Sequence, residues 1–413
     1  MLEIVEHKVQ SIIWDAHSGY RDGIVYLEKG DFQKEVQKNL SGTYELDFLP
    51  AYPGESKRII HITDIIKPAY KTDSETYPGW EKKGNYCGEG VRHQTSDLCI
   101  TQSFQYPGIQ EGIIDMEGEG AKYSVFSEKI HLVMVTRLLD ENTSKQDVAH
   151  DLIQMMLNAS VYIGRLLSQG TGSSKVYEEL AEENELPYVG YAYFIQAQGP
   201  LRNVHLFGEN CMKMKPRLVQ PEQVMDGAVV SGNYIISCQK NPTYFHQDNP
   251  VIHELYERTG KDFNFGGVIF STESSSLDEK RENAKMIAEI AKKHGFQGII
   301  ITQEGGGHAD VDLMQTCEAC EKAGISTVIL ANELGGPLGN LPSLVSFSDK
   351  ADAIVSTGNN DELIQLKKVN EVIGTPKTLN QTLEANGELN ISLGMMYTAT
   401  CQLGANKMRT QLY

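Results

Sequence analysis

The sequence predicts an α/β protein that joins a mixed, β-rich N-terminal region to a doubly wound, mainly parallel sheet in a C-terminal domain. Short apolar runs between turn-forming residues dominate the first part of the chain, as in short strands. After residue 265, continuous apolar runs alternate with amphipathic stretches, which is typical of strands covered by helices on both faces. The chain has 413 residues, of which 40% are hydrophobic, so it can bury a sizeable core.

The N-terminal elements are expected to be short strands followed by one long helix. A short helix is predicted for residues 31–40 with Asp31 as its N-cap, and residues 71–90 are predicted to form a loop. Apolar residues at helical spacing predict a long helix over residues 143–167. Strands are predicted at residues 11–14, 23–27, 58–63, 130–135 and 188–196.

The C-terminal part predicts a parallel sheet more clearly. Helices are expected at residues 278–294 and 310–323. Strands are expected at residues 267–270, 298–302, 327–331 and 353–356. Ligands of such sheets bind beyond the carboxyl ends of the strands, which points to residues 271–273, 303–308 and 332–333. We place the division at residue 230, with residues 1–230 as the N-terminal mixed α/β region and residues 231–413 as the C-terminal α/β domain.

Charge and composition exclude several classes of function. The net charge of -18 argues against nucleic acid and against an anionic membrane surface as partners. No apolar run reaches the roughly 18 residues of a membrane span, and the N-terminus lacks the basic start and apolar core of a signal peptide. The seven cysteines are thinly scattered, which is typical of reduced thiols. We expect a cytoplasmic protein that binds small molecules or a basic partner.

The segment QEGGGHADVD, residues 303–312, is the richest of the strand-end loops. Its side chains Glu304, His308, Asp310 and Asp312 can serve as acid, base or metal ligands. In the alternative, Asp310 only caps the next helix and the glycines only form the turn. The spacing matches no known set of metal ligands, so we assign no metal, although a metal-dependent hydrolase built on these four residues stays open. Cys317 and Cys320 share one face of a predicted helix, which favours core packing and leaves a redox role undecided.

Several motifs together resemble one family. They are PGIQEGIIDM at 107–116, SGN at 231–233 followed by CQK at 238–240, NPVIHELYERTGKDFNFGGVI at 249–269, ITQEG at 301–305 with DVDLM at 310–314 and the two cysteines after it, and NKMRTQLY at 406–413. Nearly end to end, the chain resembles the proprotein subunit of component B of the glycine/sarcosine/betaine reductases. The D-proline reductase proprotein is a more distant alternative.

The resemblance implies an oxidoreductase subunit for reductive C–N cleavage in amino-acid fermentation. It implies a hetero-oligomer in which a selenocysteine-containing partner subunit attacks the carbon next to the substrate carboxylate and expels the amine. In the glycine-type member, the proprotein is cut between an asparagine and a cysteine. That cysteine becomes a pyruvoyl group, whose ketone holds a primary amine as a Schiff base.

Tyr234 stands at the position of the cleaved cysteine, directly after Asn233. Its phenol oxygen is held across the ring from its own backbone, and it offers no β-leaving group, so it cannot form pyruvoyl. Cys238 lies four residues later and matches a second cysteine of the family pattern. We therefore expect an uncleaved chain with no pyruvoyl group and no cofactor of its own.

A quaternary amine is the substrate class that this change favours. A quaternary ammonium leaves as a neutral tertiary amine, cannot form a Schiff base, and binds over aromatic faces. We expect the substrate-binding subunit of a betaine-type reductase, with a non-catalytic assembly subunit of the same complex as the alternative. The expected substrate contacts are Tyr234, Asn233, Cys238, Tyr244 and Phe245, with Tyr256 as a further aromatic candidate. The expected catalytic residues are Glu304, His308 and His253.

Overall fold

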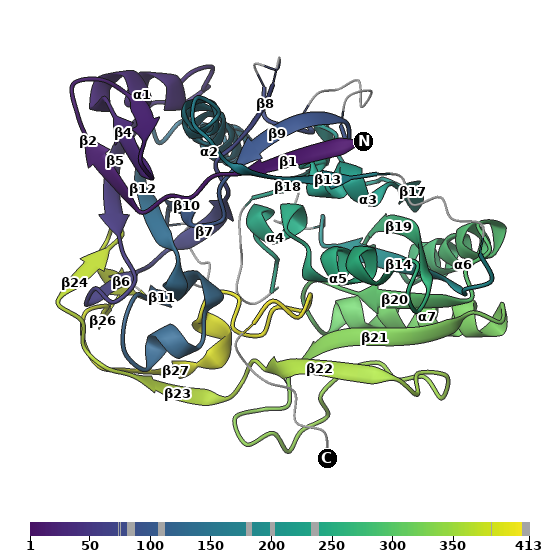
Figure 1. Cartoon of the computed structure of the whole chain (residues 1–413). Coiled ribbons are helices and arrows are strands. Elements are labelled where there is room, and N and C mark those ends of the chain that lie inside the picture. Colours follow the sequence, from purple (N-terminus) through teal and green to yellow (C-terminus); the bar gives the residue numbers. More distant parts are fainter. Residues whose placement is uncertain are drawn as a thin grey trace.

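A computed structural model describes residues 1–72, 74, 76–80, 87–105, 112–178, 184–198, 203–232, 239–380 and 382–406. It confirms the predicted α/β class, with sheets of mixed direction in the N-terminal region and a mainly parallel sheet beside them (Figure 1). The candidate residues Asn233, Tyr234 and Cys238 lie outside the described residues. Within the described part of the chain, no helix combines the length and the apolar character that a membrane span needs.

The largest sheet has six strands in the order β17-β19-β14-β20-β21-β22. Their bounds are β14 (Tyr188–Ile195), β17 (Arg217–Val219), β19 (Asn264–Thr272), β20 (Gly298–Thr302), β21 (Ser326–Glu333) and β22 (Ile354–Asn359). All neighbours pair in parallel except β17, which is antiparallel to β19. The first parallel strand, β14, lies between the second, β19, and the third, β20. The winding direction therefore reverses between β14 and β20, and such a switch point is where open α/β sheets bind ligands.

Alternating side chains of β14 cover the two faces of this sheet. Ala192 and Phe194 pack in a core with helices α6 (Leu277–Lys293) and α7 (His308–Lys322). Tyr191, Tyr193 and Ile195 belong to the core on the opposite face, with helices α4 (Thr243–Gln247) and α5 (Pro250–Arg258). Helices thus cover both faces, as in a doubly wound sheet.

The N-terminal region contains small sheets and the long helix α2 (Lys145–Leu167), whose apolar face shares a core with strands such as β4, β5, β10 and β12. Two sheets have four strands, in the orders β13-β1-β9-β8 and β5-β12-β10-β7, and two have three, in the orders β2-β4-β3 and β16-β15-β18. Their strands are β1 (Leu2–Glu6), β2 (Ser11–Trp14), β3 (Gly19–Arg21), β4 (Ile24–Leu27), β5 (Tyr44–Ala51), β7 (Ile62–Ile66), β8 (Ala69–Lys71), β9 (Gly90–Gln94), β10 (Leu98–Ser103), β12 (Ile130–Leu138), β13 (Ser173–Tyr177), β15 (Val204–Leu206), β16 (Glu209–Asn210) and β18 (Val229–Ser231). The helices α1 (Lys29–Val36), α3 (Pro221–Met225), η1 (Gly120–Lys122) and η2 (Val125–Glu128) connect them.

The C-terminal residues return to the N-terminal region. Strand β24 (Glu371–Ile373) pairs in parallel with β6 (Lys57–Ile59), which pairs on its other side with β11 (Ile114–Asp115). Figure 1 shows this return as yellow-green strands beside purple and blue ones. The remaining elements of this part are β23 (Leu363–Leu366), β25 (Thr378–Leu379), β26 (Leu383–Glu384), β27 (Leu389–Ser392) and η4 (Leu393–Met395).

Most predicted elements appear within a few residues of their predicted bounds, and two predictions were wrong in detail. The helix predicted at residues 31–40 is α1, and its N-cap is Glu28, whose carboxylate accepts from Gly30 N and Asp31 N, instead of Asp31. The strand predicted at residues 58–63 is split into β6 and β7, because His61 adopts a positive φ of 53°. Strands β14 and β17 precede residue 230 and yet share a sheet with β19, while the division at residue 230 stays a prediction.

Candidate functional site

Glu304 joins the two strands that border the switch point. It follows β20, and its carboxylate accepts hydrogen bonds from Gln196 N, just beyond β14 (2.8 Å to Oε2), and from Asn241 N (2.8 Å to Oε1). Its side chain is fully buried. The strand-end loop that the sequence singled out therefore places its glutamate at the position where a doubly wound sheet binds ligands.

Glu304 is only partly ionised near pH 7. Burial raises the pKa of Glu304 to about 7, although Lys240 and the two backbone N–H groups act in the opposite direction. Its Oε1 lies 3.6 Å from His246 Nε2. Burial, followed by repulsion from Lys240, lowers the pKa of His246 to about 3, so this imidazole is neutral. Near pH 7 Glu304 is populated both as an acid and as a carboxylate, and it can donate or accept a proton.

A second buried carboxyl, Asp64, belongs to β7 and faces the start of α4. It accepts from Thr243 N (2.9 Å) and from the Thr243 hydroxyl (2.7 Å). The same hydroxyl accepts from Ser231 N at 3.0 Å. Burial raises the pKa of Asp64 to about 7, and the bonds from Thr243 oppose this effect most strongly.

Lys240 is the cation of this group. Its side chain is buried, and its Nζ lies 3.4 Å from the carbonyl oxygen of Gly232. We call Asp64, Lys240, Thr243, His246 and Glu304 the buried cluster. It contacts described residues on both sides of residues 233–238, through Ser231 and Gly232 before them and through Lys240 and Asn241 after them.

A pocket of about 510 Å³ lies at the carboxyl end of β19, next to the buried cluster. Glu273 lines it and connects the two, because its Oε1 accepts from Glu304 N at 3.0 Å. Its other oxygen, Oε2, is buried and has no hydrogen-bond partner among the described residues. Burial, then repulsion from Asp312 and Glu304, raises the pKa of Glu273 well above its usual range, so this carboxyl is neutral and can donate or accept a hydrogen bond.

The other residues of the predicted strand-end set do not join Glu304. His308 is exposed at the first position of α7. Asp310 accepts from Gln303 Nε2 and from Val345 N, both at 2.8 Å, and Asp312 forms a buried ion pair with Lys280. Among the described residues, no group of three or more His, Cys, Asp or Glu could hold a metal ion.

The aromatic candidates have partners inside the protein. The ring of Tyr244 is faced by Lys67 Nζ at 4.7 Å and by Lys129 Nζ at 5.3 Å from its centroid. The ring of Phe245 packs against Phe126, with centroids 5.1 Å apart. Tyr256 packs against Tyr177 at the same centroid distance. These contacts give each ring a role in packing.

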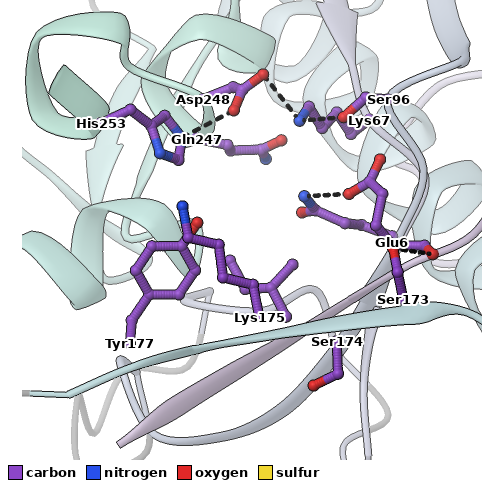
Figure 2. A pocket seen from close by; sticks show the side chains of 12 residues that line it. Glu6, Lys67, Ser96, Ser173, Ser174, Lys175, Tyr177, Gln247, Asp248 and His253 are labelled. Carbon is purple, nitrogen blue, oxygen red and sulfur yellow. Dashed lines mark hydrogen bonds and ion pairs between the residues drawn. The ribbon is translucent and has the colours of Figure 1, made fainter. Parts of the chain in front are cut away.

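His253 and the two helical cysteines lie apart from the buried cluster. His253 belongs to α5 and lines a separate pocket, where its Nε2 lies 2.8 Å from Asp248 Oδ1 (Figure 2). Cys317 and Cys320 are fully buried in the core beneath α7, and burial raises the pKa of both, to about 12 for Cys320. Both are therefore un-ionised thiols in the packed core.

Sequence reasoning missed four members of the buried cluster, Asp64, Lys240, Thr243 and His246. Lys240 carried a usable signal, because it ends the CQK motif that follows the segment 233–238. Asp64 and His246 carried none. Asp64 lies 179 positions before the threonine that binds it, and only the fold brings the two together.

Comparisons with known proteins agree with the sequence motifs. The sequence profile of the family described as "Glycine/sarcosine/betaine reductase component B subunits" matches residues 1–411. The chain is 33% identical over 430 residues to "Glycine reductase complex component B subunits alpha and beta" of Acetoanaerobium sticklandii, with both chains fully covered.

Two further relatives come from Peptoclostridium acidaminophilum. "Sarcosine reductase complex component B subunit alpha" is 29% identical over 432 residues, again with full coverage. "Betaine reductase complex component B subunit alpha" is 31% identical over 401 residues, which cover 92% of this chain and 88% of the relative. No solved structure matches the chain.

Proposed function

We propose that this chain, which belongs to the family of glycine/sarcosine/betaine reductase component B subunits, is the substrate-binding subunit of a reductase complex. The complex would cleave a quaternary amine such as betaine. The complex would contain a selenocysteine-bearing partner subunit. The partner's selenolate would form a Se–C bond to the carbon next to the carboxylate, while the C–N bond breaks and its electron pair leaves with nitrogen. The protein would work in the cytoplasm.

The observation that supports this proposal most strongly is that the buried cluster contacts the described residues on both sides of residues 233–238. A buried cation and two carboxyls with raised pKa values are costly to keep in a protein interior, and such groups gather at functional sites. The nearby pocket is linked to the cluster through Glu273, which lines the pocket and accepts from Glu304 N. We infer that the segment and the cluster together form the substrate site.

A pyruvoyl group does not fit this chain. The residue at the position that would form it is Tyr234, which has neither the nucleophile nor the leaving group for that conversion. The names of the relatives also differ between the glycine type and the other two types. The glycine-type relative is named as two subunits, alpha and beta, whereas the sarcosine- and betaine-type relatives are named as one, alpha. We propose that this chain stays whole.

The cluster would contribute binding and orientation. Lys240 would attract the carboxylate of the substrate, and the protonated form of Glu304 would avoid repelling it. The ring of Tyr234 would face the quaternary ammonium, since cations are attracted to aromatic faces. No step requires a proton on the leaving group, because a tertiary amine leaves as a neutral molecule.

The test is reconstitution of the full chain with its selenocysteine-containing partner. We expect trimethylamine release from betaine to exceed ammonia release from glycine, and the intact mass to show one uncut chain without a carbonyl-reagent adduct. Fragments that end near Asn233, or a carbonyl adduct, would contradict the proposal. A chain that binds no amine and yet is needed for assembly would instead be the non-catalytic assembly subunit.

A further inference from the structure

A second pocket, of about 270 Å³, lies on a different side of helix α4 from the buried cluster. Helix α4 supplies His246 to the cluster and its next residue, Gln247, to this pocket. The other walls come from β1, β9, β13 and α5, together with Lys67 and Ser96. Figure 2 shows the side chains of Glu6, Lys175, Gln247 and His253 around one common space.

Gln247 is the unusual residue of this pocket. Its side chain is only 3% exposed, and neither its Nε2 nor its Oε1 has a hydrogen-bond partner among the described residues. Figure 2 shows the amide extending toward the centre of the pocket. An unpaired buried amide costs folding free energy, so a hydrogen-bonding partner from outside the chain would remove this cost. That partner must offer one acceptor and one donor.

The strongest charges of the pocket already neutralise each other. Asp248 lies 3.0 Å from Lys67 Nζ and 2.8 Å from His253 Nε2. Although burial opposes ionisation, these two neighbours hold the pKa of Asp248 well below its usual range. Lys67, Asp248 and His253 are therefore paired with one another in the wall of the pocket.

Glu6 and Lys175 leave one charge of each sign for a ligand. Glu6 Oε2 accepts from Gln94 Nε2 at 2.9 Å, and a carboxylate accepts several hydrogen bonds. Lys175 has its ammonium 5.0 Å from the centroid of Tyr177, and its ion pair with Glu257, at 3.2 Å, is exposed and therefore weak. Figure 2 shows the Lys175 ammonium and the Glu6 carboxylate on opposite sides of the space.

We propose that this pocket is a second ligand site, for a small amino-acid zwitterion that carries N–H groups. The ligand ammonium would donate to Glu6 and to Gln247 Oε1, and its carboxylate would accept from Lys175 and from Gln247 Nε2. The volume corresponds to about nine water molecules, which admits a small amino acid and excludes a nucleotide. A quaternary ammonium has no N–H to donate, so this site selects against the substrate class proposed for the buried cluster and is independent of it.

Calorimetric titration of the purified full chain with glycine, L-alanine and betaine tests this site. Glycine or alanine should bind the unaltered chain, and Gln247→Leu and Glu6→Gln should each weaken that binding at least tenfold. Glu388→Gln, in a different pocket, is the matched control and should change nothing. Thermal unfolding of each variant verifies that it is folded.

Two results would overturn the second site. One is the absence of amino-acid binding by the folded chain at millimolar concentrations. The other is binding that both pocket variants leave unchanged. Tyr234→Leu separates the two proposals, because it should weaken betaine binding and leave glycine or alanine binding at Gln247 as it was.

Discussion

Glu304 and Asp64 are buried carboxyls whose pKa values rise to about 7 from ordinary values of 4.5 and 3.8. Between the ordinary and the raised values, the folded state binds more protons than the unfolded state. The free energy of unfolding contributed by these groups is therefore highest in acid, falls as pH rises toward 7, and levels off above that pH. Ionisation of these two buried carboxyls therefore lowers the free energy of unfolding.

Replacement of Glu304 by glutamine should remove its share of this pH dependence. Urea unfolding at several pH values between 5 and 8 should show that the unaltered chain loses more stability with rising pH than Glu304→Gln does, by up to roughly 3 kcal/mol. Glu384→Gln, at an exposed position, should keep the original slope. Parallel pH profiles for the unaltered chain and Glu304→Gln would show that Glu304 titrates normally.

We propose that Tyr234 decides the substrate class. Tyr234→Phe keeps the ring and should leave betaine affinity nearly unchanged. Tyr234→Leu keeps the bulk but loses the attraction of the ring face for a cation, about 1.4 kcal/mol, and should weaken betaine about tenfold. Calorimetry on the three proteins measures this, with glycine as the ligand that should not respond. Equal betaine affinity in the unaltered chain and both variants would favour the alternative that this chain is a non-catalytic assembly subunit.

Helix α4 connects the buried cluster to the second pocket, and its first residue, Thr243, holds Asp64. Thr243→Val keeps the shape and removes the hydroxyl, so the loss of stability should be about 1–3 kcal/mol. The loss should be larger at pH 8 than at pH 5, because the hydroxyl stabilises the ionised form of Asp64.

Thr243→Ser serves as the control for that variant. It keeps the hydroxyl and loses one methyl group, so its effect should not depend on pH. Urea unfolding of both variants at the two pH values makes the comparison. A loss for Thr243→Val that is the same at pH 5 and pH 8 would show that the hydroxyl does not control Asp64.

Elements with a strong local pattern could be predicted from the sequence, and elements defined by distant pairing could not. Strand β20 and helices α2 and α6 were predicted because their apolar residues repeat over many positions. Strand β24 has three residues and owes its conformation to β6, more than 300 positions earlier. Glu304 was accessible because a strand end can be recognised locally, whereas Asp64 became a site residue only through the tertiary contact with Thr243.

On the scale of the whole molecule, Arg58 binds the C-terminal residues to the N-terminal region. Its guanidinium is fully buried and forms two hydrogen bonds with Asp115, at 2.6 and 2.9 Å. It also donates to the carbonyl oxygens of Lys367, Ala385 and Gly387. One side chain of β6 therefore binds three points on a segment more than 300 residues away.

Loss of the carboxylate partner should be severe. Asp115→Asn leaves the Arg58 charge buried without compensation, which should cost about 3–5 kcal/mol of stability. Limited proteolysis should also cut sooner within residues 360–395. Glu45→Gln breaks an ion pair with Arg137 that is exposed, and should leave both readouts unchanged. If Asp115→Asn were as stable as Glu45→Gln, Arg58 would not hold the C-terminal residues in place.

Strand pairing, as well as the covalent chain, joins the elements that come before residue 233 to those that come after residue 238. Strands β14 and β17 come before this interval and are hydrogen-bonded to β19 and β20 after it, while β6 and β24 join the two sides again at the far end of the molecule. Two shorter polypeptides that meet at this interval would share one sheet and one core. A gene split at this point would thus encode halves that must be made together, because neither half completes the six-stranded sheet alone.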